Sequence, residues 1–141
     1  MSELSRYLFL AGAVPLLFLG TAHAVATPLS TSDRKGLTPR DPALIESMQK
    51  VSVLLTRRTD MWLTWIGFNL SHSLGVLVFA VCILVVGRSA ESFAGQAAFC
   101  VPLATVVAAL YVAIGLKYWF RTPIAGCAMS LACFAGSWAT L

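Results

Sequence analysis

The residues best suited to chemistry lie within an apolar stretch at residues 61–86. There, Trp65, Asn69, His72 and Ser73 interrupt a run of aliphatic and aromatic side chains. At 3.6 residues per turn, these four positions share one face of a helix. Polar groups inside hydrocarbon are unfavourable unless they find partners, so we expect this face to point into a helical bundle. It is the main candidate for a functional site.

His72 could serve several kinds of chemistry or a structural purpose. A neutral imidazole can relay protons, act as a general acid or base, or ligate a haem iron. The structural alternative is an interhelical hydrogen bond that holds the bundle together. The sequence leaves these alternatives open, and the cofactor, if there is one, is unknown.

His23 is the only other histidine and lies near the end of the first apolar run, at residues 7–27. It could share a polar cavity with Asn69 or form a bis-histidine haem site with His72. Counting about 1.5 Å per residue from the ends of the two runs puts His23 about 6 Å deep and His72 about 16 Å deep. Because ligands of one iron must be nearly level, a height difference of about 10 Å argues against haem.

An all-α bundle of four transmembrane helices is expected to position these residues. The chain has 141 residues, of which 58% are hydrophobic and 11% charged, whereas soluble domains average about 25% charged residues. A spanning helix needs about 20 apolar residues. We expect spans at residues 7–27, 61–86, 93–119 and 123–141, forming a single integral membrane domain over residues 1–141.

The polar segment at residues 28–60 is the one sizeable stretch outside the expected spans. Within it, Asp41 followed by Pro42 is typical of a helix N-cap with proline in the first turn. The apolar residues that follow at helical spacing predict a short amphipathic helix at the membrane interface. These residues are Leu44, Ile45, Met48, Val51 and Leu55.

The same segment carries basic residues that could bind lipid. Arg40, Arg57 and Arg58 could hold phosphate or other headgroups through their guanidinium groups, although topology and helix capping explain them equally well. Eight Lys and Arg residues lie in this segment and in the turn before the fourth span, against two on the other side, Arg6 and Arg88. This bias predicts that residues 28–60 are cytoplasmic and both termini outside. Nucleic acid is not expected as a partner.

The first apolar run also has features of a secretory signal peptide. Ala22-His23-Ala24 matches a small-x-small cleavage site. Cleavage after Ala24 would leave three spans and place the basic segment outside, against the charge bias. Retention of the first helix is therefore the favoured interpretation, with cleavage as the alternative.

The fourth expected span has small residues four positions apart. They are Gly126 with Ser130, and Ala128 with Ala132 and Gly136. Such surfaces let helices approach closely. We expect this span either to dock tightly in its own bundle or to contact a second copy or another membrane subunit. The four cysteines lack metal-site spacing, so no metal is expected.

Three short segments resemble small bacterial four-helix membrane proteins, and the size and layout of the chain are similar to the DoxX-like group. The segments are Gly20-Thr21-Ala22-His23, Pro39-Arg40-Asp41-Pro42 and the stretch from Trp65 to Ser73. The resemblance implies a bacterial inner membrane and supplies no mechanism.

Two classes of function follow as hypotheses, beside a third, a homo-oligomeric small transporter. The first is binding or association in the lipid bilayer, as an accessory subunit of a membrane complex or as a binder of a lipid-like molecule. The second is an intramembrane enzyme or a redox or haem carrier that uses His72, with His23 and Asn69 in support.

Overall fold

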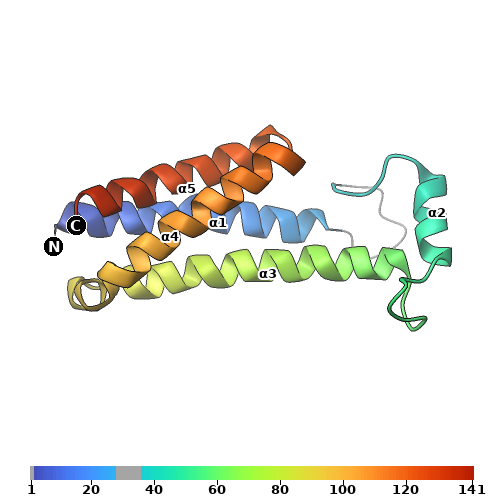
Figure 1. Cartoon of the computed structure of the whole chain (residues 1–141), viewed down its shortest axis with the longest axis horizontal. Coiled ribbons are helices and arrows are strands. Elements are labelled where there is room, and N and C mark those ends of the chain that lie inside the picture. Colours follow the sequence, from blue (N-terminus) through green and yellow to red (C-terminus); the bar gives the residue numbers. More distant parts are fainter. Residues whose placement is uncertain (1, 28–35) are drawn as a thin grey trace. The chain divides into compact units, whose positions relative to one another are not determined.

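The computed structural model describes residues 2–27 and 36–141, and its regular secondary structure there is entirely helical (Figure 1). The helices are α1 (Glu3–Ala26), α2 (Pro42–Lys50), α3 (Met61–Gly87), α4 (Ala90–Tyr118) and α5 (Arg121–Ala139). The predicted all-α class is thus confirmed for these residues. In the same part of the chain, α1, α3 and α4 are long and apolar enough to cross a membrane, and α5 is not among the helices that meet this criterion.

Two of the long helices begin earlier than the expected spans because polar residues form their first turns. α1 begins at Glu3 rather than at residue 7, and the Ser2 hydroxyl accepts a hydrogen bond from the Ser5 N–H at 3.1 Å. α4 begins at Ala90 rather than at residue 93, because Ser89 caps it. Hydropathy locates the apolar part of a helix and misses such capped ends.

α2 begins as predicted and ends sooner. The Asp41 carboxylate accepts a hydrogen bond from the Ala43 N–H at 2.9 Å, which confirms the expected N-cap. The helix stops at Lys50, so Val51 and Leu55 do not extend its apolar face as predicted. Val51 is extended instead, since its carbonyl accepts a hydrogen bond from the N–H of Met61 at 2.9 Å.

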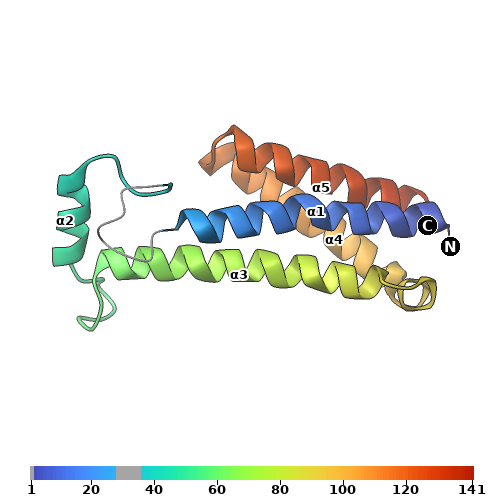
Figure 2. The ribbon, with the colours of Figure 1, turned by 180° about the vertical axis from the view of Figure 1, so that it is seen from behind.

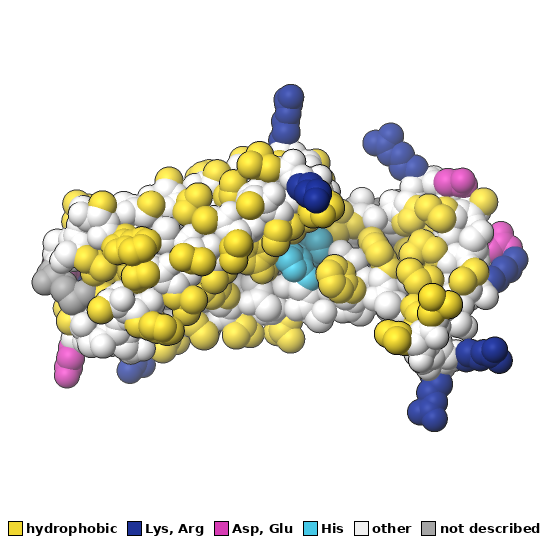
Figure 3. Space-filling view, in the orientation of Figure 1, with side chains coloured by type: hydrophobic (Ala, Val, Ile, Leu, Met, Phe, Trp, Pro, Cys, Tyr) yellow, Lys and Arg dark blue, Asp and Glu magenta, His cyan; other side chains and the backbone are white. Residues whose placement is uncertain are grey.

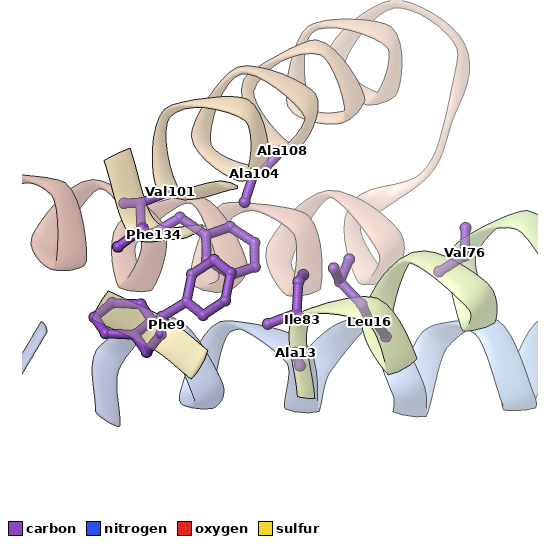
Figure 4. Close-up of a cluster of buried hydrophobic side chains, with 12 residues drawn as sticks. Phe9, Ala13, Leu16, Val76, Ile83, Val101, Ala104, Ala108 and Phe134 are labelled. Atoms are coloured by element: carbon purple, nitrogen blue, oxygen red, sulfur yellow. The ribbon is translucent and has the colours of Figure 1, made fainter. Parts of the chain in front are cut away.

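The chain divides into two compact units, one formed by Met1–Leu19 with Val76–Leu141 and the other by Gly20–Gly75. The first unit holds an apolar core to which four helices contribute (Figure 4). The core residues are Phe9, Ala13, Leu16, Val76, Ala80, Ile83, Phe93, Ala97, Val101, Ala104, Ala108 and Phe134. At its centre the Phe9 ring lies 5.4 Å from the Phe93 ring and 5.8 Å from the Phe134 ring.

Within the first unit, α5 runs antiparallel to α1 (Figures 1 and 2). Two glycines, one on each helix, allow α1 and α5 to pack closely. A Cβ atom on Gly12 would lie 2.3 Å from Cε1 of Phe134, and one on Gly126 would lie 2.6 Å from Cδ1 of Leu19. Both distances are far below van der Waals contact, so the absence of a side chain at these glycines lets the two helices pack directly.

A reciprocal pair of hydrogen bonds joins the first turn of α1 to the last turn of α5. The Ser5 hydroxyl donates to the Ser137 carbonyl at 2.8 Å, and the Ser137 hydroxyl donates to the Ser5 carbonyl at 2.8 Å. Both serines are fully buried. This serine clasp, together with a 2.7 Å hydrogen bond from the Ser2 hydroxyl to the Thr140 carbonyl, holds the two ends of the chain together.

The contact between α1 and α5 predicts that a glycine-to-alanine substitution lowers stability at position 12 and not at position 95. Gly12→Ala should lower the thermal midpoint of the detergent-solubilised protein by several degrees, since overpacking against the buried Phe134 ring costs about 1–3 kcal/mol. Gly95→Ala is the matched control, because no atom outside its own stretch of helix backbone lies within 4 Å of its added Cβ. Replacing glycine by alanine inside a helix adds about 1 kcal/mol of stability in both variants. The difference between their midpoints therefore measures the clash at position 12. Equal midpoints for the two variants would contradict the proposed close contact.

Candidate functional site

The candidate site lies in the second unit, where the end of α1 meets the first half of α3. His23 Nε2 is 3.0 Å from Oδ1 of Asn69. The His23 and His72 rings are 5.4 Å apart between centroids and meet edge to face at 71°. All three side chains are partly buried, and histidine atoms reach the surface in Figure 3. We call these three residues the polar site.

The backbone of α3 determines how the polar site is hydrogen bonded. Nδ2 of Asn69 donates to the Trp65 carbonyl at 2.7 Å, so the amide oxygen faces His23. An amide oxygen only accepts, and therefore Nε2–H of His23 is the donor. In the neutral imidazole, Nδ1 of His23 is then a hydrogen-bond acceptor.

Neighbouring residues hold the polar site in place. The buried Ser73 hydroxyl donates to the Asn69 carbonyl at 3.0 Å, and the buried Thr27 hydroxyl donates to the His23 carbonyl at 2.9 Å. The Phe68 ring stacks on His72 with 6.5 Å between centroids and 12° between planes. Ser73 was a predicted site residue, and here it bonds to the backbone. Thr27 and Phe68 were missed, although each lies four residues after or before a histidine.

Trp65, the remaining candidate on this face, contributes its backbone carbonyl to Asn69. Its indole ring stacks on that of Trp62, with 5.2 Å between centroids and 14° between planes. Trp65 therefore orients the polar site from one turn away.

The predicted height difference between the two histidines is wrong. It assumed that each helix enters the membrane at its terminal residue. Because His23 pairs with Asn69, the start of α3 at Met61 extends roughly 8 Å beyond the end of α1 at Ala26. His72 is more residues from the start of α3 than His23 is from the end of α1 because of this overhang. The two rings are nevertheless in contact.

Proximity alone does not make a bis-histidine haem site. Haem iron binds one nitrogen from each side of a flat macrocycle. The rings of His23 and His72 are in direct edge-to-face contact, and Nε2 of His23 is engaged by Asn69. A porphyrin does not fit between rings arranged in this way. Within residues 2–27 and 36–141, no group of three or more His, Cys, Asp or Glu side chains is suited to hold a metal ion.

The other candidate residues are distributed over both units. Arg40, Arg57 and Arg58 are exposed in the second unit, and neither of the ion pairs found among the described residues involves them.

In the first unit, Ser130 is fully buried and Gly126 packs against Leu19 of α1. Gly136 also faces α1, since its added Cβ would lie 3.3 Å from Cδ1 of Leu8. Ala132 is exposed. The two sets of small residues in α5 therefore do not form one continuous face.

Comparison with known proteins adds no assignment: no family model, no curated protein and no solved structure matches this chain. The chemistry of the site therefore has to be argued from its own geometry.

The hydrogen bond between His23 and Asn69 should be measurable as a coupling energy. In a double-mutant cycle of His23→Phe and Asn69→Leu, thermal unfolding in detergent should show a coupling of about 0.6–2 kcal/mol, as for other hydrogen bonds between membrane helices. Ser71→Ala combined with His23→Phe is the control, because Ser71 is exposed and bonds to the Phe68 carbonyl. A coupling no larger than that of the control would show that the pair adds no stability.

Proposed function

We propose that this protein is a bacterial inner-membrane protein of four transmembrane helices that binds a lipid-like molecule at the polar site. The observation that carries the proposal is the hydrogen-bonded pair of His23 and Asn69 beside the ring of His72. These partly exposed polar groups lie on two helices that are otherwise apolar enough to cross a membrane.

The packing of α5 against α1 supports a fourth span. Contacts between the two helices extend from Gly126 beside Leu19 to Ser137 beside Ser5. An antiparallel partner that follows α1 over this length lies at the same depths as α1. Its 19 residues correspond to about 28 Å, close to the thickness of the hydrocarbon core.

The structure of α1 supports its retention as a span. Phe9, Ala13 and Leu16 of α1 are buried in the centre of the first unit. Cleavage after Ala24 would remove these side chains and half of the serine clasp, and would also separate His23 from Asn69.

The charge bias supports an orientation with residues 28–60 in the cytoplasm. In this arrangement α2 lies along the cytoplasmic interface, with Ile45 packed against the protein and Lys50 exposed to headgroups. The polar site then lies near the cytoplasmic end of α1, since His23 is in the last turn of that helix.

The donors and acceptors of the polar site define the class of ligand. Nδ1 of His23 accepts, so it is matched by a hydroxyl group. The Phe68 ring is 69% exposed beside His72, and it offers an apolar surface for a hydrocarbon tail. A long-chain alcohol, phenol or similar amphiphile fulfils both conditions.

Binding can be tested with a brominated long-chain alcohol, using quenching of tryptophan fluorescence in detergent, because Trp62 and Trp65 lie within three turns of the polar site. The alcohol should bind the parent protein at least about tenfold more tightly than a brominated alkane of equal length, which corresponds to one hydrogen bond of about 1.4 kcal/mol. Asn69→Leu should abolish this preference, because His23 is then no longer oriented.

Ser71→Ala is the control variant and should leave the preference unchanged. Equal affinities for alcohol and alkane in the parent protein would exclude a hydroxyl-binding site. A Soret band in the purified protein would instead support a haem carrier, and copurification of a stoichiometric membrane protein would support an accessory subunit.

The topology makes a second prediction. Alkaline phosphatase fused after Leu141 should be active, whereas a green fluorescent protein at the same position should be dark, because four spans place the C-terminus outside. If α5 does not cross the membrane, the C-terminus remains with Lys117 and Arg121 in the cytoplasm, and the two reporters exchange their behaviour. Reporter fusions in the loop after Gly87 provide the matched control for an outside position.

A further inference from the structure

The segment between α2 and α3 forms a closed loop at residues 52–60. Ser52 and Asp60 pair as an isolated antiparallel β-bridge at its base. Asp60 also caps α3, since its carboxylate accepts a hydrogen bond from the Leu63 N–H at 2.8 Å. Both ends of the loop therefore lie next to the start of α3. A turn at its tip is held by a 3.3 Å hydrogen bond from the Thr56 N–H to the Val53 carbonyl.

Two leucines occupy the tip of this loop. Leu54 and Leu55 expose 108% and 98% of their reference surface, more than any other large hydrophobic residue described. Two adjacent leucines without packing partners in an ordered loop are unfavourable in water and mark an interaction surface.

Basic residues lie on both sides of the leucines in the sequence. Arg57 and Arg58 follow the leucines after one residue, Thr56, and are exposed; the N–H of Arg58 donates to the Thr56 hydroxyl at 3.1 Å. Lys50 precedes the loop and forms an ion pair with Glu46, so Arg57 and Arg58 are the basic residues beside the leucines that have no ion pair among the described residues. Figure 3 shows hydrophobic side chains gathered over α2 and the loop, with Lys and Arg side chains and some Asp and Glu side chains at the rim. This combination is complementary to an anionic lipid surface, which offers hydrocarbon and phosphate side by side.

We propose that residues 52–60 form a membrane anchor in which Leu54 and Leu55 insert into an anionic leaflet while Arg57 and Arg58 contact its phosphates. The position of the loop supports a lipid partner, because Asp60 is joined directly to a helix that is long and apolar enough to cross the bilayer. The anchor depends on membrane insertion of the chain and is independent of ligand binding at the polar site.

The test uses the full chain with Leu54→Cys or Leu55→Cys, labelled with an environment-sensitive fluorophore and reconstituted in vesicles. Gln49→Cys is the matched control, because Gln49 is an exposed polar residue of α2. The unsubstituted protein corrects for the native cysteines. One set of vesicles is phosphatidylcholine and the other contains added phosphatidylglycerol.

In phosphatidylglycerol vesicles, labels at positions 54 and 55 should shift to shorter emission wavelengths, resist aqueous iodide and be quenched by spin-labelled lipid. The label at position 49 should remain accessible to quenching by aqueous iodide. Neutralising both arginines, with Arg57→Gln and Arg58→Gln, should reduce the ratio of inserted to exposed loop by about 30-fold, given about 1 kcal/mol per basic residue at an anionic surface.

Equal iodide quenching at positions 49, 54 and 55 in both vesicles would overturn the anchor. Protection that is the same with and without phosphatidylglycerol would overturn the role of the arginines. Protection that appears in detergent and rises with protein concentration would assign the leucines to a contact between copies of the chain. Tryptophan quenching by the brominated alcohol should be the same in Leu54→Cys as in the parent protein, which separates the anchor from the polar site.

Discussion

A hydroxyl, amide or imidazole carried into an apolar surrounding needs a hydrogen-bond partner from the chain itself, because no water is present to supply one. In this protein several helical hydroxyls bond to a carbonyl four residues earlier, as Thr105 does with Val101 and Ser73 with Asn69. Other polar side chains pair with a side chain of another helix instead. Ser5 bonds to Ser137, and His23 bonds to Asn69. These pairs decide which residues of neighbouring helices are level with one another.

The Ser5–Ser137 pair and the His23–Asn69 pair differ in exposure. Because of this difference we assign the first pair a structural role and propose ligand binding at the second. The serine clasp is fully buried and both of its hydroxyls are used within the protein. The polar site is only partly buried, and its imidazoles lie beside an exposed phenylalanine ring. Buried pairs of this kind hold helices together, whereas the second ring nitrogen of a partly exposed imidazole can accept a hydrogen bond from a ligand while the first keeps its internal partner. For this reason our proposal of ligand binding concerns His23 and Asn69 rather than the serines.

Local signals in the sequence were sufficient for much of the fold. Asp41 and Pro42 predicted the start of α2, because capping depends on neighbours within three residues. The predicted inward face of α3 includes Asn69 and Ser73, which the structure places partly or fully out of solvent. The end of α2 was not predicted. Val51 and Leu55 continue the helical spacing, and the chain nevertheless leaves the helix to pair Ser52 with Asp60.

By itself the sequence determined the all-α class, three of the four apolar helices that it predicted and the polar residues among them, because hydropathy and helical period are properties of consecutive residues. Only the tertiary structure decided which helices are neighbours and in what register. Gly12 faces Phe134, and His23 is level with Asn69. Apolar side chains are nearly interchangeable in hydropathy, so their pattern does not specify a partner. Shape and paired hydrogen bonds do, and they exist only when distant segments meet.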